Sequence, residues 1–189
     1  MSRFTRRHFV TAVAALAVAG CAAPQITNPF AANTAQIDQR VGHTMSTLYQ
    51  EFPNLRQLES KASGALVMPL MTEAGFGLGG SYGRGALVID GDIQDYYVAT
   101  SATFGFQIGA QQYGHVLYFM TDEALNNFRN SAGWSAGGDI EYAIRDMGGN
   151  LRMDTNTALA PVFAVIFGQA GLKVGATLEG SKYTRIQGQ

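Results

Sequence analysis

The sequence predicts an α+β fold in which N-terminal helices and one short inserted helix pack on an antiparallel, strongly twisted, glycine-rich sheet. Apolar residues recur every three or four positions over residues 34–51, and several later segments alternate large and small residues. The chain also contains 23 glycines among its 189 residues. Glycines permit sharp bends in a strand, so a barrel-like curvature of the sheet is an open alternative.

The first 20 residues have the composition of a cleavable export signal. Three arginines precede an uncharged stretch over 10–20, and the only cysteine of the chain, Cys21, follows it directly. These 11 apolar and small residues are too few to span a bilayer, which takes about 20. Residues 18–21 (Val-Ala-Gly-Cys) resemble a bacterial lipobox, so we expect Cys21 to become the acylated first residue of the mature protein. The alternatives are that Cys21 is an ordinary small residue in a cleavable signal, or that this segment is a short buried helix.

A second export feature lies just before the apolar stretch. The segment 5–10 resembles a twin-arginine motif, in which Arg6 and Arg7 precede the large apolar residue Phe9. Two adjacent arginines also occur by chance in basic signal regions, so the export route and the lipid anchor are separate expectations.

The composition of the mature chain limits its partners. Removal of residues 1–20 removes three of the 13 basic residues and none of the 14 acidic ones, which leaves a net charge of −4. The remaining 169 residues suit one domain. Because there is no basic excess, nucleic acid is not an expected partner. A single cysteine permits neither an intramolecular disulfide nor a cysteine-based metal cluster, and we expect no cofactor or metal.

Two helices are expected at the start of the domain. The Pro- and Asn-containing segment 21–33 is predicted to be a tether between the lipid and the domain at 34–189. A helix over 34–51 would stack Ile37, Val41, Met45 and Leu48 on one face, with Asn33 or Thr34 as its cap. Pro53 should end this helix and open a second, shorter one.

Strands are expected over most of the remaining domain. Residues 65–68 form a short apolar run that Pro69 should stop, and 75–85 place glycine or serine at every odd position. Asp90-Gly91 predicts a turn between strands, and further strands are expected over 94–100, 104–110, 115–120, 162–167 and 171–179. Thr121 should cap a short helix, 131–144 should form a strand pair, and 147–157 a polar loop. We expect the helices to cover the glycine face.

Several motifs have a plain structural explanation. Residues 75–80 fit the dinucleotide pattern G-x-G-x-x-G, but the alternation continues through them and no helical period comes after them, so a strand is favoured. The histidines of the mature chain, His43 and His115, stand in no catalytic motif, and we expect no enzymatic activity. Three acids at 90, 92 and 95 could hold calcium, although a solvated turn is preferred. Trp134 is expected in the core, with an interfacial anchor as the alternative.

Basic residues near the C-terminus form the one local cluster of positive charge. Lys173, Lys182 and Arg185 lie within 13 positions of one another, and Arg84 would join them if the fold brought it near. Each such residue contributes about 1 kcal/mol at an anionic surface. These four residues are the candidates for contact with a lipid headgroup.

The strand segments resemble those of a known family. Residues 64–69, 74–80, 83–85, 104–110 and 171–181 are similar in order and spacing to the SYLF domain, also called the Ysc84 actin-binding domain, over about 34–186. The resemblance implies a lipid-binding module without catalysis, and exported, often lipid-anchored envelope proteins as its bacterial members. The basic N-terminal segment of eukaryotic members is reduced here to Arg40 on the first helix.

The sequence therefore predicts a non-enzymatic phospholipid-binding lipoprotein of a bacterial cell envelope. Ala22 after the cysteine resembles an outer-membrane address, with the domain facing the periplasm. The expected partners are the covalent lipid on Cys21 and membrane phospholipid, whereas actin is not expected. The alternative is a structural or scaffold protein that binds another envelope protein through its sheet.

Overall fold

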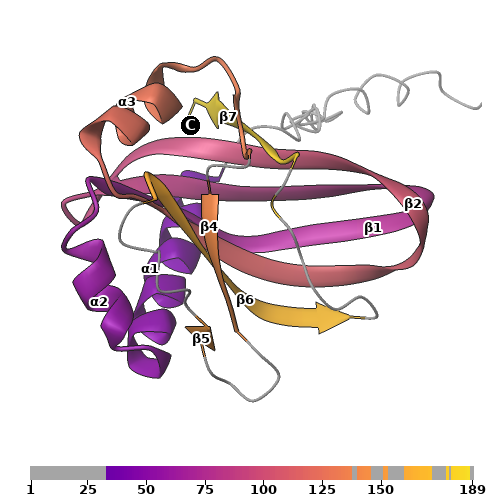
Figure 1. The fold of residues 1–189 in the computed structure, drawn as a ribbon, viewed down its shortest axis with the longest axis horizontal. Coiled ribbons are helices and arrows are strands. Elements are labelled where there is room, and N and C mark those ends of the chain that lie inside the picture. Colours follow the sequence, from indigo (N-terminus) through magenta and orange to yellow (C-terminus); the bar gives the residue numbers. More distant parts are fainter. Residues whose placement is uncertain are drawn as a thin grey trace, which may run out of the picture.

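The computed structural model describes residues 33–137, 140–145, 151–152, 160–171, 178 and 180–187. The predictions for the export signal, for Cys21 and for the tether before Asn33 lie outside these residues. The elements are α1 (Thr34–Glu51), α2 (Asn54–Glu59), β1 (Gly64–Ile89), β2 (Asp92–Phe119), α3 (Asp122–Asn130), β3 (Trp134–Ser135), β4 (Ile140–Arg145), β5 (Leu151–Arg152), β6 (Val162–Gly171) and β7 (Lys182–Ile186). The α+β class and the strongly twisted, curled sheet are confirmed (Figure 1).

One long hairpin, made by β1 and β2, forms the centre of the sheet. The two strands pair antiparallel from Gly64 opposite Phe119 to Ile89 opposite Asp92. Asp90 and Gly91 join them with φ angles of 53° and 86°. Two consecutive positive φ values match the twist of the flanking strands, so the predicted turn is confirmed. The hairpin bends back on itself at the right of Figure 1, at the end of the sheet remote from α2 and α3.

Pro69 does not end a strand, contrary to the sequence prediction. Met68 pairs with His115 and Met71 pairs with Tyr113, so Pro69 and Leu70 stand opposite one residue, Gly114. Such a bulge leaves residues outside the hydrogen-bond ladder, and a proline without an N–H is tolerated there. The bulge also shifts the alternation by one, so that Met68 and Met71 belong to the same buried cluster.

The glycine face of β1 is covered differently from the prediction. A Cβ atom on Gly83 would lie 2.6 Å from the carbonyl oxygen of Leu70, and a Cβ on Gly85 would collide with the carbonyl oxygen of Val67. The earlier half of the same strand therefore packs on this face, where only glycine leaves room. The N-terminal helix α1 packs on the opposite face, against Ala86 and its neighbours.

The described strands form a sheet of order β3-β7-β2-β6-β4-β5, with β1 on β2. All pairs are antiparallel except β4 with β6, which is parallel. The strand pair expected over 131–144 is wrong, because β3 pairs with β7 whereas β4 pairs with β6 and β5. A two-residue strand, β5, lies within the predicted polar loop, and β7 was not predicted. The strand expected over 171–179 lies largely outside the described residues.

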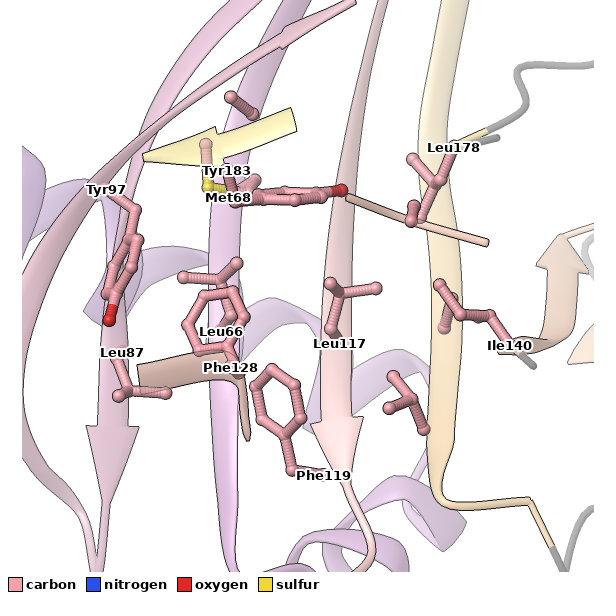
Figure 2. Packing of buried hydrophobic residues seen from close by; sticks show 14 of the residues in the cluster. Leu66, Met68, Leu87, Tyr97, Leu117, Phe119, Phe128, Ile140, Leu178 and Tyr183 are labelled. Atoms are coloured by element: carbon pink, nitrogen blue, oxygen red, sulfur yellow. The ribbon is translucent and has the colours of Figure 1, made fainter. Parts of the chain in front are cut away.

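Two hydrophobic cores lie on the two faces of the sheet. The inner core, part of which Figure 2 shows, joins both halves of the hairpin with α3 through residues such as Leu66, Leu117, Phe119 and Phe128. The outer core places Ile37, Val41, Met45 and Leu48 of α1 on the sheet, as the helical spacing predicted. Each such side chain contributes about 1.5–3 kcal/mol when fully buried.

The helix ends agree with the sequence signals. The side chain of Asn33 accepts a hydrogen bond from the backbone N–H of Gln36, and Thr121 accepts one from Ala124 at the start of α3. The first turn of α3 carries Asp122 and Glu123, whose charges suit the positive end of the helix. Among the described residues, no helix has the length and apolar composition needed to cross a bilayer.

Candidate functional site

A cavity of about 230 Å³ lies between the first turns of α1 and the bulged part of β1. It is referred to below as the arginine pocket. Its walls combine polar and apolar residues and include two arginines. The lining residues are Asn33, Gln36, Ile37, Arg40, Pro69, Leu70, Thr72, Tyr82, Gly83 and Arg84. Among these described lining residues there is no aspartate or glutamate. The pocket lining therefore carries positive charge and also includes apolar side chains.

The side chains of Arg84 and Tyr82 form one unit at the pocket. The Nε–H of Arg84 donates a hydrogen bond to the hydroxyl of Tyr82, and the guanidinium carbon lies 5.7 Å from the centre of the Tyr82 ring. A tyrosine ring attracts a cation placed over it and restricts the long arginine side chain. Planar guanidinium groups suit phosphate and carboxylate oxygens because several N–H donors lie in one fork.

The bulge and the close approach of β1 to itself create the pocket. Leu70 belongs to the bulge and is 38% exposed, while Tyr82 is 40% exposed, so both side chains reach solvent. Gly83 allows the backbone of residue 70 to lie directly against this part of the strand. Helix α1 is fixed above it, because the hydroxyl of Tyr96 donates to Asp38 Oδ1 at 2.8 Å.

The alternation of the strands separates the predicted headgroup residues. Arg84 pairs with Val98, which pairs with Thr184 of β7, and Tyr82 pairs with Thr100, which pairs with Lys182. Residues directly opposite share a face, so Arg84 and Lys182 lie on the same face. Arg185 is an odd number of positions from Lys182 and lies on the other face. Lys173 lies outside the described residues.

Arg185 is engaged on its own face of the sheet. Its Nε lies 3.7 Å from Asp95 Oδ1, and its terminal nitrogen donates to the backbone carbonyl of Arg129 at 2.7 Å. Arg129 also reaches Asp95, with 3.5 Å between nitrogen and oxygen. These contacts connect β7, β2 and α3, so Arg185 has a structural role that the sequence did not indicate.

The two histidines and the acidic turn lie outside the lining of the arginine pocket. His115 is completely buried, with its Nε2 atom 2.8 Å from the hydroxyl of Tyr183, and burial lowers its pKa to about 3. Its Nδ1 atom has no partner among the described residues. His43 is exposed on α1. Asp90 and Asp92 are exposed, and the described residues contain no group of acids, histidines and cysteines that could hold a metal ion.

Trp134 lies at the edge of the inner core, as expected. Its ring centre is 5.5 Å from that of Phe128 and 5.7 Å from that of Tyr183. The inner face also holds buried polar groups that sequence reasoning missed: the amide of Gln111 donates to Glu73 at 2.7 Å, and Ser81 and Ser101 are hydrogen-bonded at 2.7 Å. The sequence signal that could have indicated the buried Ser81 is its odd position in 75–85, which it shares with the glycines of that strand.

Sequence reasoning also missed that Arg40 and Arg84 line the same pocket. The two residues are 44 positions apart, and only the packing of α1 over β1 brings them to one cavity. In the part of the chain that the structure describes, the guanidinium of Arg40 makes no hydrogen bond or ion pair. Its charge is therefore available to a ligand at the arginine pocket.

The comparisons with known proteins agree with the resemblance seen in the strand segments. Residues 100–187 match the family model Ysc84, described as "Las17-binding protein actin regulator". This match covers most of β2 and all later elements through β7. No curated protein matches the chain. Residues 100–187 are therefore similar to the Ysc84 (SYLF) family.

Proposed function

We propose that this protein is a non-enzymatic, phospholipid-binding lipoprotein of a bacterial cell envelope, and that the arginine pocket receives the anionic part of the lipid headgroup. In this proposal, export through the twin-arginine signal is followed by acylation of Cys21. The covalent lipid then holds the domain on the outer membrane, facing the periplasm. The partner of the domain itself is the membrane phospholipid.

The observation that carries the proposal is the presence of Arg40 and Arg84 at one cavity that has no acidic lining residue among those described. A phosphodiester needs a positive site with several N–H donors, which two guanidinium groups supply. The exposed side chains of Leu70 and Tyr82 beside them supply apolar contact. A membrane surface requires both kinds of contact at one place.

The position of Asn33 adds geometric support. Asn33 lines the arginine pocket and is the first described residue, so the segment that leads back to Cys21 begins at the pocket. The 12 residues 21–32 reach at most about 40 Å when fully extended. An acylated Cys21 would therefore keep the pocket close to the bilayer and raise its effective concentration there.

The test is sedimentation of the full chain, with Cys21→Ser to prevent acylation, in the presence of vesicles. One set of vesicles contains phosphatidylcholine alone, and the other an equal mixture of phosphatidylcholine and phosphatidylglycerol. We expect binding to the anionic set that weakens as salt is raised. Arg40→Gln and Arg84→Gln should each weaken it about fivefold, because each basic group contributes about 1 kcal/mol.

Lys61→Gln is the matched control, because it removes the same charge from an exposed position between α2 and β1, away from the pocket. We expect the control to bind as the parent does. Equal binding of all three variants would remove the arginine pocket from the proposal. Absence of binding to both vesicle sets would contradict the lipid-binding function and direct attention to a protein partner.

A further inference from the structure

The hairpin of β1 and β2 has a sharp bend, called the elbow below, at residues 75–78 and 104–109. The register is regular up to Phe76 opposite Ile108 and resumes with Leu78 opposite Phe104. Gly77 alone therefore stands across from residues 105–107, and the longer path on β2 makes the strands turn. Figure 1 shows this bend as the end of the sheet that is remote from α2 and α3.

The elbow has an unusual composition for the end of a sheet. Neither 74–83 of β1 nor 96–114 of β2 contains an aspartate, glutamate, lysine or arginine. The residue pairs that flank the register shift are apolar: Phe76 with Ile108, and Leu78 with Phe104. Leu78 is 61% exposed, the most exposed large hydrophobic side chain among the described residues. Charged residues normally protect such positions on soluble proteins.

A polarity gradient runs along β1 from the elbow to the arginine pocket. Leu78, Tyr82 and Arg84 occupy even positions in a part of the strand with regular register, so they share one face. Along this face the apolar Leu78 is followed by Tyr82, an aromatic residue with a hydroxyl, and then by the cationic Arg84. Leu78 and Arg84 are about 20 Å apart along the strand, at about 3.3 Å per residue. Acyl chains, the interfacial layer and the phosphates of a bilayer have the same order, and tyrosine is enriched at that interface.

We propose that Leu78 at the elbow inserts into the interfacial layer of an anionic phospholipid bilayer, while Tyr82 lies at the headgroups and Arg84 and Arg40 contact phosphates. This inference rests on the proposed function and specifies how the membrane is engaged. An anionic bilayer fits this surface, because Arg84 of the positive pocket lies on the same face of β1 as Leu78 and Tyr82. The chain segment leading to Cys21 also starts at this pocket.

The backbone of the elbow sets the depth of insertion. Only Gly77 stands across the hairpin from residues 105–107, so the backbone of this segment does not pair residue for residue. Peptide groups outside the ladder require water or headgroup partners, and in hydrocarbon each unsatisfied group costs several kcal/mol. The elbow should therefore stop near the boundary of headgroups and acyl chains, at the depth of about 5–10 Å that is usual for interfacial segments.

The test places a fluorophore at the elbow. In the full chain with Cys21→Ser, Leu78→Cys is labelled with an environment-sensitive nitrobenzoxadiazole dye and mixed with the phosphatidylcholine–phosphatidylglycerol vesicles. We expect a blue shift, and quenching by phospholipid that carries a nitroxide on the acyl chain near the headgroup. Gln57→Cys, on the exposed side of α2, is the matched control and should show neither change.

A second variant tests the contribution to binding without a label. Leu78→Asp removes the apolar side chain and adds a charge, and should weaken sedimentation with anionic vesicles about tenfold. Gln57→Asp adds the same charge elsewhere and should weaken it much less. Circular dichroism shows whether both variants are folded.

The outcomes separate this inference from the function on which it rests. Vesicle binding that is weakened in Arg84→Gln, but leaves the dye at position 78 unshifted and unquenched, would overturn insertion and retain headgroup binding. No vesicle binding by the unlabelled chain would overturn both. A blue shift that grows with protein concentration in the absence of vesicles would assign the elbow to contact between copies of the chain and overturn insertion.

Discussion

The hydroxyl of Tyr183 on β7 lies 2.8 Å from Nε2 of His115 on β2, inside the curled sheet. Since β7 pairs with β2 only over residues 96–100, this hydrogen bond connects the last strand to the later half of β2, beyond the bend. Burial keeps His115 neutral, with a pKa of about 3 in the folded protein against 6.5 for an ordinary histidine.

The first prediction concerns acid stability. Below pH 6.5 the unfolded chain binds a proton at His115 that the folded protein does not bind until about pH 3. The free energy of unfolding should therefore fall as the pH falls through this window, by about 1.4 kcal/mol per pH unit once well below 6.5. Between pH 7 and pH 5 the parent should lose about 2 kcal/mol more than His115→Gln. Urea unfolding at the two pH values measures the difference. Equal losses in the parent and in His115→Gln would contradict the burial of a neutral histidine at this position.

The second prediction concerns two glycines with opposite roles. Gly85→Ala should destabilise the protein by about 1–3 kcal/mol, because the new Cβ would collide with the backbone of Val67. Gly42→Ala, in α1, meets no atom within 4 Å and should stabilise by about 0.5–1 kcal/mol through helix propensity. The midpoints of urea unfolding give both values. A stability of Gly85→Ala equal to the parent's would contradict the close approach of the two halves of β1.

The third prediction concerns the attachment of α3. The Phe128 ring centre lies 4.7 Å from those of Tyr97 and Phe119, and the side chain is buried. Phe128→Ala should cost about 3–5 kcal/mol and shift the emission of Trp134, whose ring packs on Phe128. Asn127→Ala, exposed on the same helix, should leave the emission unchanged and raise stability by at most about 0.7 kcal/mol through helix propensity. An unshifted emission maximum in Phe128→Ala would mean that α3 does not depend on this contact.

The fourth prediction distinguishes charge from geometry at the arginine pocket. Arg84→Lys keeps a positive charge but loses the planar group whose Nε–H bonds to Tyr82. We expect this variant to lose about half of the binding free energy that Arg84→Gln loses in the vesicle assay. The salt dependence should stay close to the parent's, because the number of charges is unchanged. Binding of Arg84→Lys equal to that of the parent would show that charge alone matters at this position.

Local patterns were sufficient for much of the fold. Helical spacing placed α1 at residues 34–51, and Asp90-Gly91 placed the central turn. These features depend on interactions between residues that are close in sequence, so they can be predicted from a single sequence. The prediction that Pro69 ends a strand was wrong. Proline usually interrupts the hydrogen-bond ladder of a strand, but here a bulge accommodates it. The β4–β6 pair is parallel and joins distant segments, for which no local signal exists.

The candidate site was predictable only in part. Arg84 was selected from the sequence, but neither Lys182 nor Arg185 lines the pocket that contains it, and Lys173 lies outside the described residues. Arg185 lies on the opposite face of the sheet, bound to Asp95 and Arg129, while Arg40 reaches the pocket from α1.

The sequence by itself determined the helices, the central turn, the strand-rich middle and the family resemblance, because each depends on the order and spacing of neighbouring residues. The tertiary structure decided which face Arg84 and Arg185 occupy, what covers the glycines, and that Leu78 shares the face of β1 on which Arg84 meets Arg40. These depend on the bulge at Pro69, on the bend of the hairpin and on the packing of α1. They join residues that are distant in the chain, and the physical cause is the burial of both faces of one continuous hairpin.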